Sequence, residues 1–334
     1  MQPYPVSDRT TLWRRIVTVA PDTYAQLALD VYRYQYHHNP AYRQWCDLLN
    51  RTPGAVRSYA DIPHLPISCF KSHDLRSGVW QPEVEYTSSG TTGATTARHP
   101  VRSVSAYLAH AQCLFEAVYG QLECYTVLAL LPAYLERSGS SLVAMAEHFI
   151  KASGRAASGF YLYDYPELVT RARRELAAGR KVLILGVSFA LWEMAEQHPT
   201  DLSGAIIMET GGMKGRRREI IRAELHGILT DAFGVPTIHS EYGMTELLSQ
   251  AYSLGHGIFE PSATLRVRVR EVNDPFHYLP EGRTGGINVT DLANLDTISF
   301  IATDDLGTLL PKGRFEVLGR FDNSDVRGCN LLVQ

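Results

Sequence analysis

The sequence has no paired-cysteine motif, no long apolar run and no excess of charge of one sign. Its five cysteines are isolated along the chain: Cys46, Cys69, Cys113, Cys124 and Cys329. An odd number of scattered cysteines argues against a disulfide framework and favours a reducing setting. The N-terminal stretch has no apolar signal segment, and no stretch approaches the roughly 20 apolar residues that a membrane span needs. We therefore expect a cytoplasmic protein with no membrane span.

The charges are close to balance, with 32 lysines and arginines against 35 aspartates and glutamates. Such a chain has no overall attraction for nucleic acid or anionic membrane, so we expect no nucleic-acid partner. The twelve histidines form no H-E-x-x-H pattern, which leaves a zinc site without support. The sequence also has no repeat, low-complexity tract or Ser/Gly-rich linker that would mark a domain boundary.

The 334 residues are 45% hydrophobic, which is enough for a sizeable core. Between Val84 and Gly234, short strand-like apolar runs alternate with helix-length segments, and this order is typical of βαβ units and a parallel sheet. We predict an α/β fold in one domain over residues 1–334. It comprises a helical N-terminal segment (1–60), an α/β core with a phosphate loop (61–252) and a strand-rich region (253–334).

A loop of small and hydroxyl residues, YTSSGTTG, covers residues 86–93. Small residues allow close approach to a ligand, and successive hydroxyl and backbone N–H groups can surround phosphate oxygens. The loop is not a Walker motif, because Ala94 follows the last glycine where that motif requires lysine. An ordinary turn would explain such a loop equally well if it stood alone.

Three later motifs carry groups suited to a nucleotide. YGMTE (242–246) combines an aromatic ring, a hydroxyl and a carboxylate, which can contact a base, a phosphate and Mg²⁺. TDDLG (303–307) supplies carboxylates for sugar hydroxyls, and GRFD (319–322) supplies an arginine. Each motif taken separately is more often a turn or a surface ion pair.

The order of these four motifs resembles that of the adenylate-forming, or acyl-activating, enzymes. The resemblance is closer to the LuxE-type acyl-protein synthetases, and it extends over most of the chain beyond residue 60. The stretches that carry it are LPISCFKSHDL, YTSSGTTG, LLPAYLERSGSSLVAM, ETGGMKGRRREI, SEYGMTELLSQAYS, GGINVTDLAN and FEVLGRFDNSDVRGCNLL.

The resemblance implies ATP-dependent activation of a carboxylic acid, with a fatty acid as the first candidate, to an acyl-adenylate. Thr245 would contact the α-phosphate, Glu246 would hold Mg²⁺, and Asp305 would take the ribose hydroxyls with Arg320 assisting. Tyr242 would lie near the adenine. The implied ATP-binding residues are Ser88, Ser89, Gly90, Thr91, Thr92, Gly93, Glu209, Gly211, Gly212, Tyr242, Gly243, Thr245, Asp305 and Arg320.

The sequence departs from the family pattern in two places. The Pro-Lys pair that usually closes the phosphate loop is missing, and the sequence ends at Gln334, soon after GRFD. The expected fold is therefore the large N-terminal domain of these enzymes without their mobile C-terminal domain and its catalytic lysine. Adenylation would proceed without that lysine, or a partner would supply the cation; His99 and Arg98 are local candidates.

Cys329 follows the GRFD motif directly, where the resemblance implies a cysteine that carries the acyl group. Neighbouring Arg327 would favour the thiolate that attacks the acyl carbonyl. A partner reductase or carrier protein would then accept the acyl group. The alternative is an acid-CoA or acid-carrier-protein ligase with no covalent enzyme intermediate.

Two further alternatives are open. Gly186-Val187-Ser188-Phe189-Ala190 lies between a strand-like and a helical segment, the context of a hydrolase nucleophile, with His239 or His256 as possible partners. That would make the protein an esterase or thioesterase. A non-catalytic scaffold is the other alternative, against which the retained hydroxyls, Glu246 and Asp305 argue. The basic run Arg216 to Arg218 fits a solvated helix face or a contact with CoA or a carrier protein.

Overall fold

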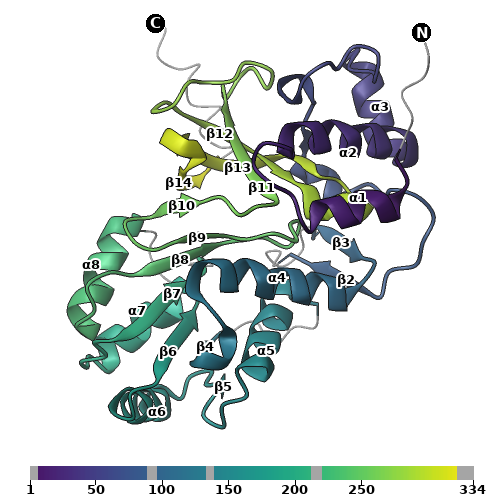
Figure 1. Ribbon diagram of the computed structural model, residues 1–334. Helices are drawn as coiled ribbons and strands as arrows, with labels where there is room; N and C mark the ends of the chain where they lie inside the picture. Colours follow the sequence, from purple (N-terminus) through teal and green to yellow (C-terminus); the bar gives the residue numbers. More distant parts are fainter. Residues whose placement is uncertain (1–6, 89–95, 133–138, 212–219, 322–334) are drawn as a thin grey trace, which may run out of the picture.

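The computed structural model describes residues 7–88, 96–132, 139–211 and 220–321. Within these residues a sheet of twelve strands runs through the molecule, with helices on its faces (Figure 1). Its main path is β11-β12-β13-β14-β10-β9-β8-β7-β6-β4-β5, and β1 (Leu65–Pro66) pairs with β13. The sheet has a parallel half and an antiparallel half, which meet at β8 and β9.

The parallel half contains the strands that are apolar on both faces. They are β4 (Tyr125–Leu130), β5 (Gly159–Phe160), β6 (Lys181–Gly186), β7 (Ala205–Glu209) and β8 (His239–Tyr242). Helices separate them along the chain, as parallel pairing requires. On one face lie α4 (Val104–Tyr119) and α5 (Ser141–Ser153), and on the other lie α6 (Tyr165–Ala177), α7 (Ser188–Gln197) and α8 (Arg222–Phe233) (Figure 1).

The antiparallel half contains the alternating strands of the C-terminal region. They are β9 (Ala251–Ser253), β10 (Ile258–Glu260), β11 (Leu265–Arg270), β12 (Thr284–Asp291), β13 (Phe300–Leu309) and β14 (Phe315–Arg320). In β11 the valines are buried and the arginines are partly exposed, which is the pattern of a sheet with one face against the core. A separate antiparallel pair is formed by β2 (Val84–Thr87) and β3 (Arg98–Val101), which precede and follow the predicted phosphate loop in the sequence.

The N-terminal helices cover the antiparallel half (Figure 1). They are α1 (Arg9–Ile16), α2 (Tyr24–His38) and α3 (Pro40–Leu48), and Asp8 and Asn39 cap α1 and α3 through their side chains. Buried Gln35 of α2 donates to the carbonyls of Asn294 and Leu295. These bonds attach the helical segment to the short turn η4 (Leu292–Asp296), which supports the site described below.

The predicted α/β fold class is confirmed, and the predicted strands and helices are found with small shifts. In the apolar run GFYLY (159–163) the strand is limited to β5, because Leu162 adopts a left-handed backbone conformation and Asp164 then caps α6. Helix α8 is described from Arg222. Arg216 to Arg218 lie outside the described residues. Within the described part of the chain, no helix is long and apolar enough to cross a membrane.

Candidate active site

The predicted site residues gather at the carboxyl end of β8, where the sheet changes from parallel to antiparallel. Tyr242 is the last residue of β8, and the YGMTE segment continues from it. On the antiparallel side, Asp305 of β13 pairs in register with Arg320 of β14. Strand ends at such a change of topology are a frequent position for ligand sites in α/β sheets.

Asp305, of the TDDLG motif, links the YGMTE motif to the GRFD motif. Its carboxylate accepts a hydrogen bond from the Tyr242 hydroxyl at 2.8 Å and another from Arg320 Nε at 3.1 Å. The Asp305 side chain is 7% exposed, whereas that of Arg320 is 73% exposed. Burial and the Asp305 carboxylate raise the pKa of Tyr242 well above its usual value, so the phenol remains a donor. Phe259 and Phe315 pack against the Tyr242 ring and hold it in place.

Glu246 lies close to Asp305 and Arg320, and among the described residues its side chain forms no hydrogen bond with either of them. Burial raises the pKa of its carboxyl group, and the charge of Arg320 opposes that shift. The carbonyl of Glu246 accepts a hydrogen bond from Asn294 Nδ2 at 2.7 Å, which fixes the main chain of the motif on η4. No cluster of three metal-ligating side chains occurs in the described residues. One carboxylate still suits Mg²⁺, which often takes its remaining ligands from phosphates and water.

His99 supports the same segment from β3. Its Nδ1 donates to the Thr245 carbonyl at 2.7 Å, and its Nε2 lies 3.0 Å from the Thr297 hydroxyl. Burial lowers the pKa of His99 to about 4, so the ring is neutral. The hypothesis that His99 replaces the missing lysine as a cation is therefore wrong. Arg98, its neighbour on β3, is exposed.

Lys71 is a residue at this site to which the sequence analysis gave no role. It ends the turn η2 (Ile67–Lys71), next to Phe70, whose ring contacts His99 at 5.4 Å. Burial raises the pKa of Glu246, and the charge of Lys71 opposes that rise, so the two side chains lie within electrostatic reach of one another. The stretch LPISCFK contributed to the family resemblance, but no local pattern in it indicated chemistry.

Glu209, one of the implied ATP-binding residues, has a carboxylate that is bound by other groups of the protein. Its buried carboxylate accepts hydrogen bonds from Ser188 Oγ (3.0 Å), the Gly211 amide (2.7 Å) and Arg222 Nε (3.1 Å). Burial alone would raise the pKa of Glu209, but His226, Arg222 and the hydrogen-bond donors together lower it to about 2. The carboxylate therefore stays ionised and joins β7 to the first turn of α8.

The same contacts argue against the esterase alternative. The Ser188 hydroxyl donates to the Glu209 carboxylate, and His226 Nε2 lies 3.6 Å from the other oxygen of that carboxylate. A hydrolase triad places histidine between serine and the acid, so this order cannot activate Ser188. His239 is engaged elsewhere, with its Nδ1 3.1 Å from the Tyr119 hydroxyl.

Part of the predicted phosphate loop lies outside the described residues. Ser88 is described, and its Oγ accepts from the Ala97 amide at 3.0 Å, which closes the base of the loop. Ser89, Gly90, Thr91, Thr92 and Gly93 lie outside the described residues, as do Gly212 and Cys329. Their predicted roles remain predictions.

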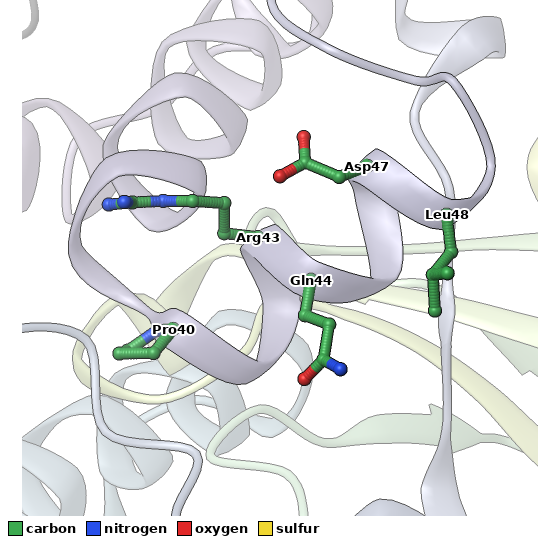
Figure 2. A pocket seen from close by; sticks show the side chains of 5 residues that line it. All are labelled: Pro40, Arg43, Gln44, Asp47 and Leu48. Atoms are coloured by element: carbon green, nitrogen blue, oxygen red, sulfur yellow. The ribbon is translucent and has the colours of Figure 1, made fainter.

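A hollow of about 440 Å³ lies elsewhere, on the outer surface of α3. Figure 2 shows that its five lining side chains all come from this helix. Asp47 already accepts the Tyr36 hydroxyl at 2.6 Å, and Arg43 Nε donates to the Tyr36 carbonyl at 3.0 Å. A hollow lined by one helix whose charged groups are satisfied gives no indication of chemistry.

The chain was compared with known proteins, and no protein-family model matches it. The long-chain-fatty-acid–luciferin-component ligase of Vibrio harveyi is 24% identical over 337 residues, covering 92% of this chain and 86% of that protein. The solved structure of ATP-bound MatB from Rhodopseudomonas palustris matches with a TM-score of 0.52 and 17% identity over 84% of this chain. This chain spans 58% of the length of that MatB chain.

A second solved structure aligns over more of both chains. It is 2-hydroxyisobutyryl-CoA ligase in complex with 2-HIB-AMP and CoA, with a TM-score of 0.62 and 15% identity. The alignment covers 96% of this chain and 73% of that one. The protein therefore has the fold of the adenylate-forming enzymes, and its resemblance to the LuxE-type acyl-protein synthetases is confirmed.

Proposed function

We propose that the protein uses ATP and Mg²⁺ to convert a carboxylic acid into an acyl-adenylate and then transfers the acyl group to a thiol. The observation that carries this proposal is the grouping of Tyr242, Asp305 and Arg320 beside Glu246. Tyr242 and Arg320 lie 78 positions apart in the sequence, so the fold brings them together. A fold shared with acid-thiol ligases, and a relative named as a fatty-acid ligase, support it.

Each group would have a distinct task during adenylation. Asp305, held by Tyr242 and Arg320, has carboxylate oxygens suited to the ribose hydroxyls. The loop from Ser88 to Gly93 would hold the phosphates while the substrate carboxylate attacks the α-phosphorus and pyrophosphate leaves. Glu246 would bind Mg²⁺, which neutralises charge on the phosphates when bound. Thr245, fixed through its carbonyl by His99, would donate to the α-phosphate.

For the second step we propose Cys329 as the first acyl acceptor. Its thiolate would attack the acyl carbonyl, AMP would leave, and a thioester would form. A partner protein would then take the acyl group. Direct transfer to CoA or to a carrier protein is the competing outcome, and the experiment below separates the two.

The adenylation step is tested by acid-dependent exchange of pyrophosphate into ATP. We expect the parent protein to catalyse this exchange with at least one acid, and Glu246→Ala to reduce its rate at least tenfold because the metal carboxylate is lost. Glu260→Ala, an exposed glutamate on β10, is the matched control and should exchange at the parental rate. Parental exchange by Glu246→Ala would exclude the metal role.

The transfer step is tested with radioactive acid in the presence of ATP. Cys329→Ser should keep pyrophosphate exchange and lose the hydroxylamine-labile protein label. Cys113→Ser and Cys124→Ser are the controls, because these two free cysteines are exposed and should not affect the label. A label that persists in Cys329→Ser, or CoA acylation with no label on the parent, would favour direct ligation.

A further inference from the structure

Asp291 is a buried carboxyl group to which the proposed function gives no task. It is the last residue of β12 and belongs to the stretch GGINVTDLAN (285–294), which contributed to the family resemblance. Its exposed fraction is 0%. A carboxyl group is costly to bury unless its oxygens are hydrogen-bonded, so the partners of Asp291 indicate what it does.

The two carboxyl oxygens of Asp291 accept hydrogen bonds from two different segments. Oδ2 accepts from the amides of Leu248 and Ser249, both at 2.9 Å, directly beyond YGMTE. Oδ1 accepts from the amide of Ala293 in η4 at 3.0 Å and from the Ser249 hydroxyl at 2.6 Å. Burial raises the pKa of Asp291, and the hydrogen bonds from Ser249 and Leu248 oppose that rise. Main-chain N–H groups donate to both oxygens in either protonation state, so Asp291 joins the two segments.

The turn η4 completes the connection to Glu246. Asn294 Nδ2, one residue beyond Ala293, donates to the Glu246 carbonyl at 2.7 Å. The main chain beyond YGMTE is thus attached to η4 at two points, at Glu246 through Asn294 and at residues 248–249 through Asp291. The bond at Glu246 uses its main-chain oxygen, so it fixes the position of this residue without occupying its carboxyl group.

We propose that Asp291 is a positioning residue for the metal carboxylate: by joining residues 248–249 to η4, it sets where the Glu246 side chain stands. This rests on the proposed function, in which Glu246 binds Mg²⁺. An asparagine at position 291 has the same shape but only one acceptor oxygen, so it can hold one segment and not both. The release should weaken the contribution of Mg²⁺ to ATP binding. It should spare the ribose contact, because Asp305 is held from β8 and β14.

The test measures ATP binding by calorimetry, once without Mg²⁺ and once with it. We expect Mg²⁺ to tighten ATP binding at least tenfold in the parent, and Asp291→Asn to reduce this gain below threefold, as Glu246→Ala should. The affinity for ATP without Mg²⁺ should stay within threefold of the parental value. Phe115→Ala, a destabilising change in the core around the parallel half, is the control and should keep the full gain.

A double variant separates positioning from a general structural effect. If Asp291 acts through Glu246, Asp291→Asn should lower the rate of pyrophosphate exchange at least tenfold in the parent but less than threefold in Glu246→Ala. Equal losses in both backgrounds overturn the inference. Should Asp291→Asn not fold, Asn294→Ser, which removes the donor to the Glu246 carbonyl, should give the same losses, and a parental Mg²⁺ gain in Asn294→Ser overturns the inference.

The calorimetric result also separates this inference from the proposed function. Exchange in the parent with a full Mg²⁺ gain in Asp291→Asn leaves the function intact and overturns the inference. If no acid supports exchange, the function fails, and the Mg²⁺ gain still tests Asp291, since that measurement needs only ATP and the metal. A gain lost in Asp291→Asn then supports the inference. Absence of any gain in the parent overturns it, because no metal carboxylate would be there to position.

Discussion

At the scale of single residues, Asp305 shows how one buried carboxylate can hold a site together. It contacts both the last residue of β8 and the last residue of β14. Charge-assisted hydrogen bonds to ribose are each worth about 1.5–3 kcal/mol, so Asp305→Ala should weaken ATP binding at least tenfold. Calorimetric titration of ATP measures this, with exposed Asp304→Ala as the control. Unchanged affinity in Asp305→Ala would place this residue outside the nucleotide site.

His99 makes a residue-scale prediction about acid stability. The pKa is about 4 in the folded protein and 6.5 is the ordinary value, so the unfolded chain takes up the proton first as pH falls. Its contribution to stability is fully present above pH 6.5 and decreases until pH 4. Between pH 7 and pH 5 the loss is about 2 kcal/mol. Urea unfolding at both pH values should show this loss in the parent and not in His99→Gln.

The pKa of His64 is shifted in the same direction, because burial lowers it to about 3. It remains in both proteins, so the difference between parent and variant isolates His99. Exposed His73→Gln is the matched control and should follow the parent curve. If His99→Gln loses as much stability as the parent between the two pH values, His99 is not the buried neutral ring described here.

At the scale of elements, Arg222 connects three of them. From the first turn of α8 it donates through Nε to Glu209 of β7 and through Nη1 to the Val317 carbonyl of β14 at 2.8 Å. Removal of the arginine would take the cation from Glu209, whose side chain is 3% exposed, and leave the buried carboxylate with His226, Ser188 and the Gly211 amide. Arg222→Met should therefore lower the free energy of unfolding by roughly 3 kcal/mol, measured by urea denaturation.

The paired variant tests the cause of this loss. Arg222→Met combined with Glu209→Gln removes both charges, so it should be more stable than Arg222→Met alone. Arg171→Met, which breaks an exposed pair with Glu167, is the surface control and should change stability little. If Arg222→Met behaves like this surface control, the bridge between α8 and β14 does not stabilise the fold.

At the scale of the whole molecule, one sheet passes through two hydrophobic cores. Phe115 belongs to the core around the parallel half and Phe300 to the core under the N-terminal helices. Because β8 and β9 are shared by both halves, we expect one cooperative unfolding transition. Phe115→Ala and Phe300→Ala should each lower the free energy of unfolding by about 3–5 kcal/mol and shift this same transition.

Circular dichroism and tryptophan fluorescence, followed together in urea, measure whether the transition is shared. Coincident curves in the parent and in both variants would support the predicted single domain over residues 1–334. Two transitions, each shifted by only one of the variants, would show that the halves fold independently.

Much of this protein was predictable from the sequence by itself. Alternation in LRVRVR and the apolar run KVLILG are local patterns, so strands β11 and β6 followed from them. The order of YGMTE, TDDLG and GRFD indicated the family, and Tyr242, Asp305 and Arg320 were named with it. Patterns within a short window determine such features, because backbone propensity and hydrophobic periodicity are local properties.

Tertiary structure decided which of these groups have partners. Its position beside the phosphate loop placed His99 among possible cations, but burial lowers its pKa and makes the ring neutral. The sequence could not show that Arg222 and Ser188 bind the Glu209 carboxylate. Burial and pairing depend on strands distant in sequence, so no local pattern contains them.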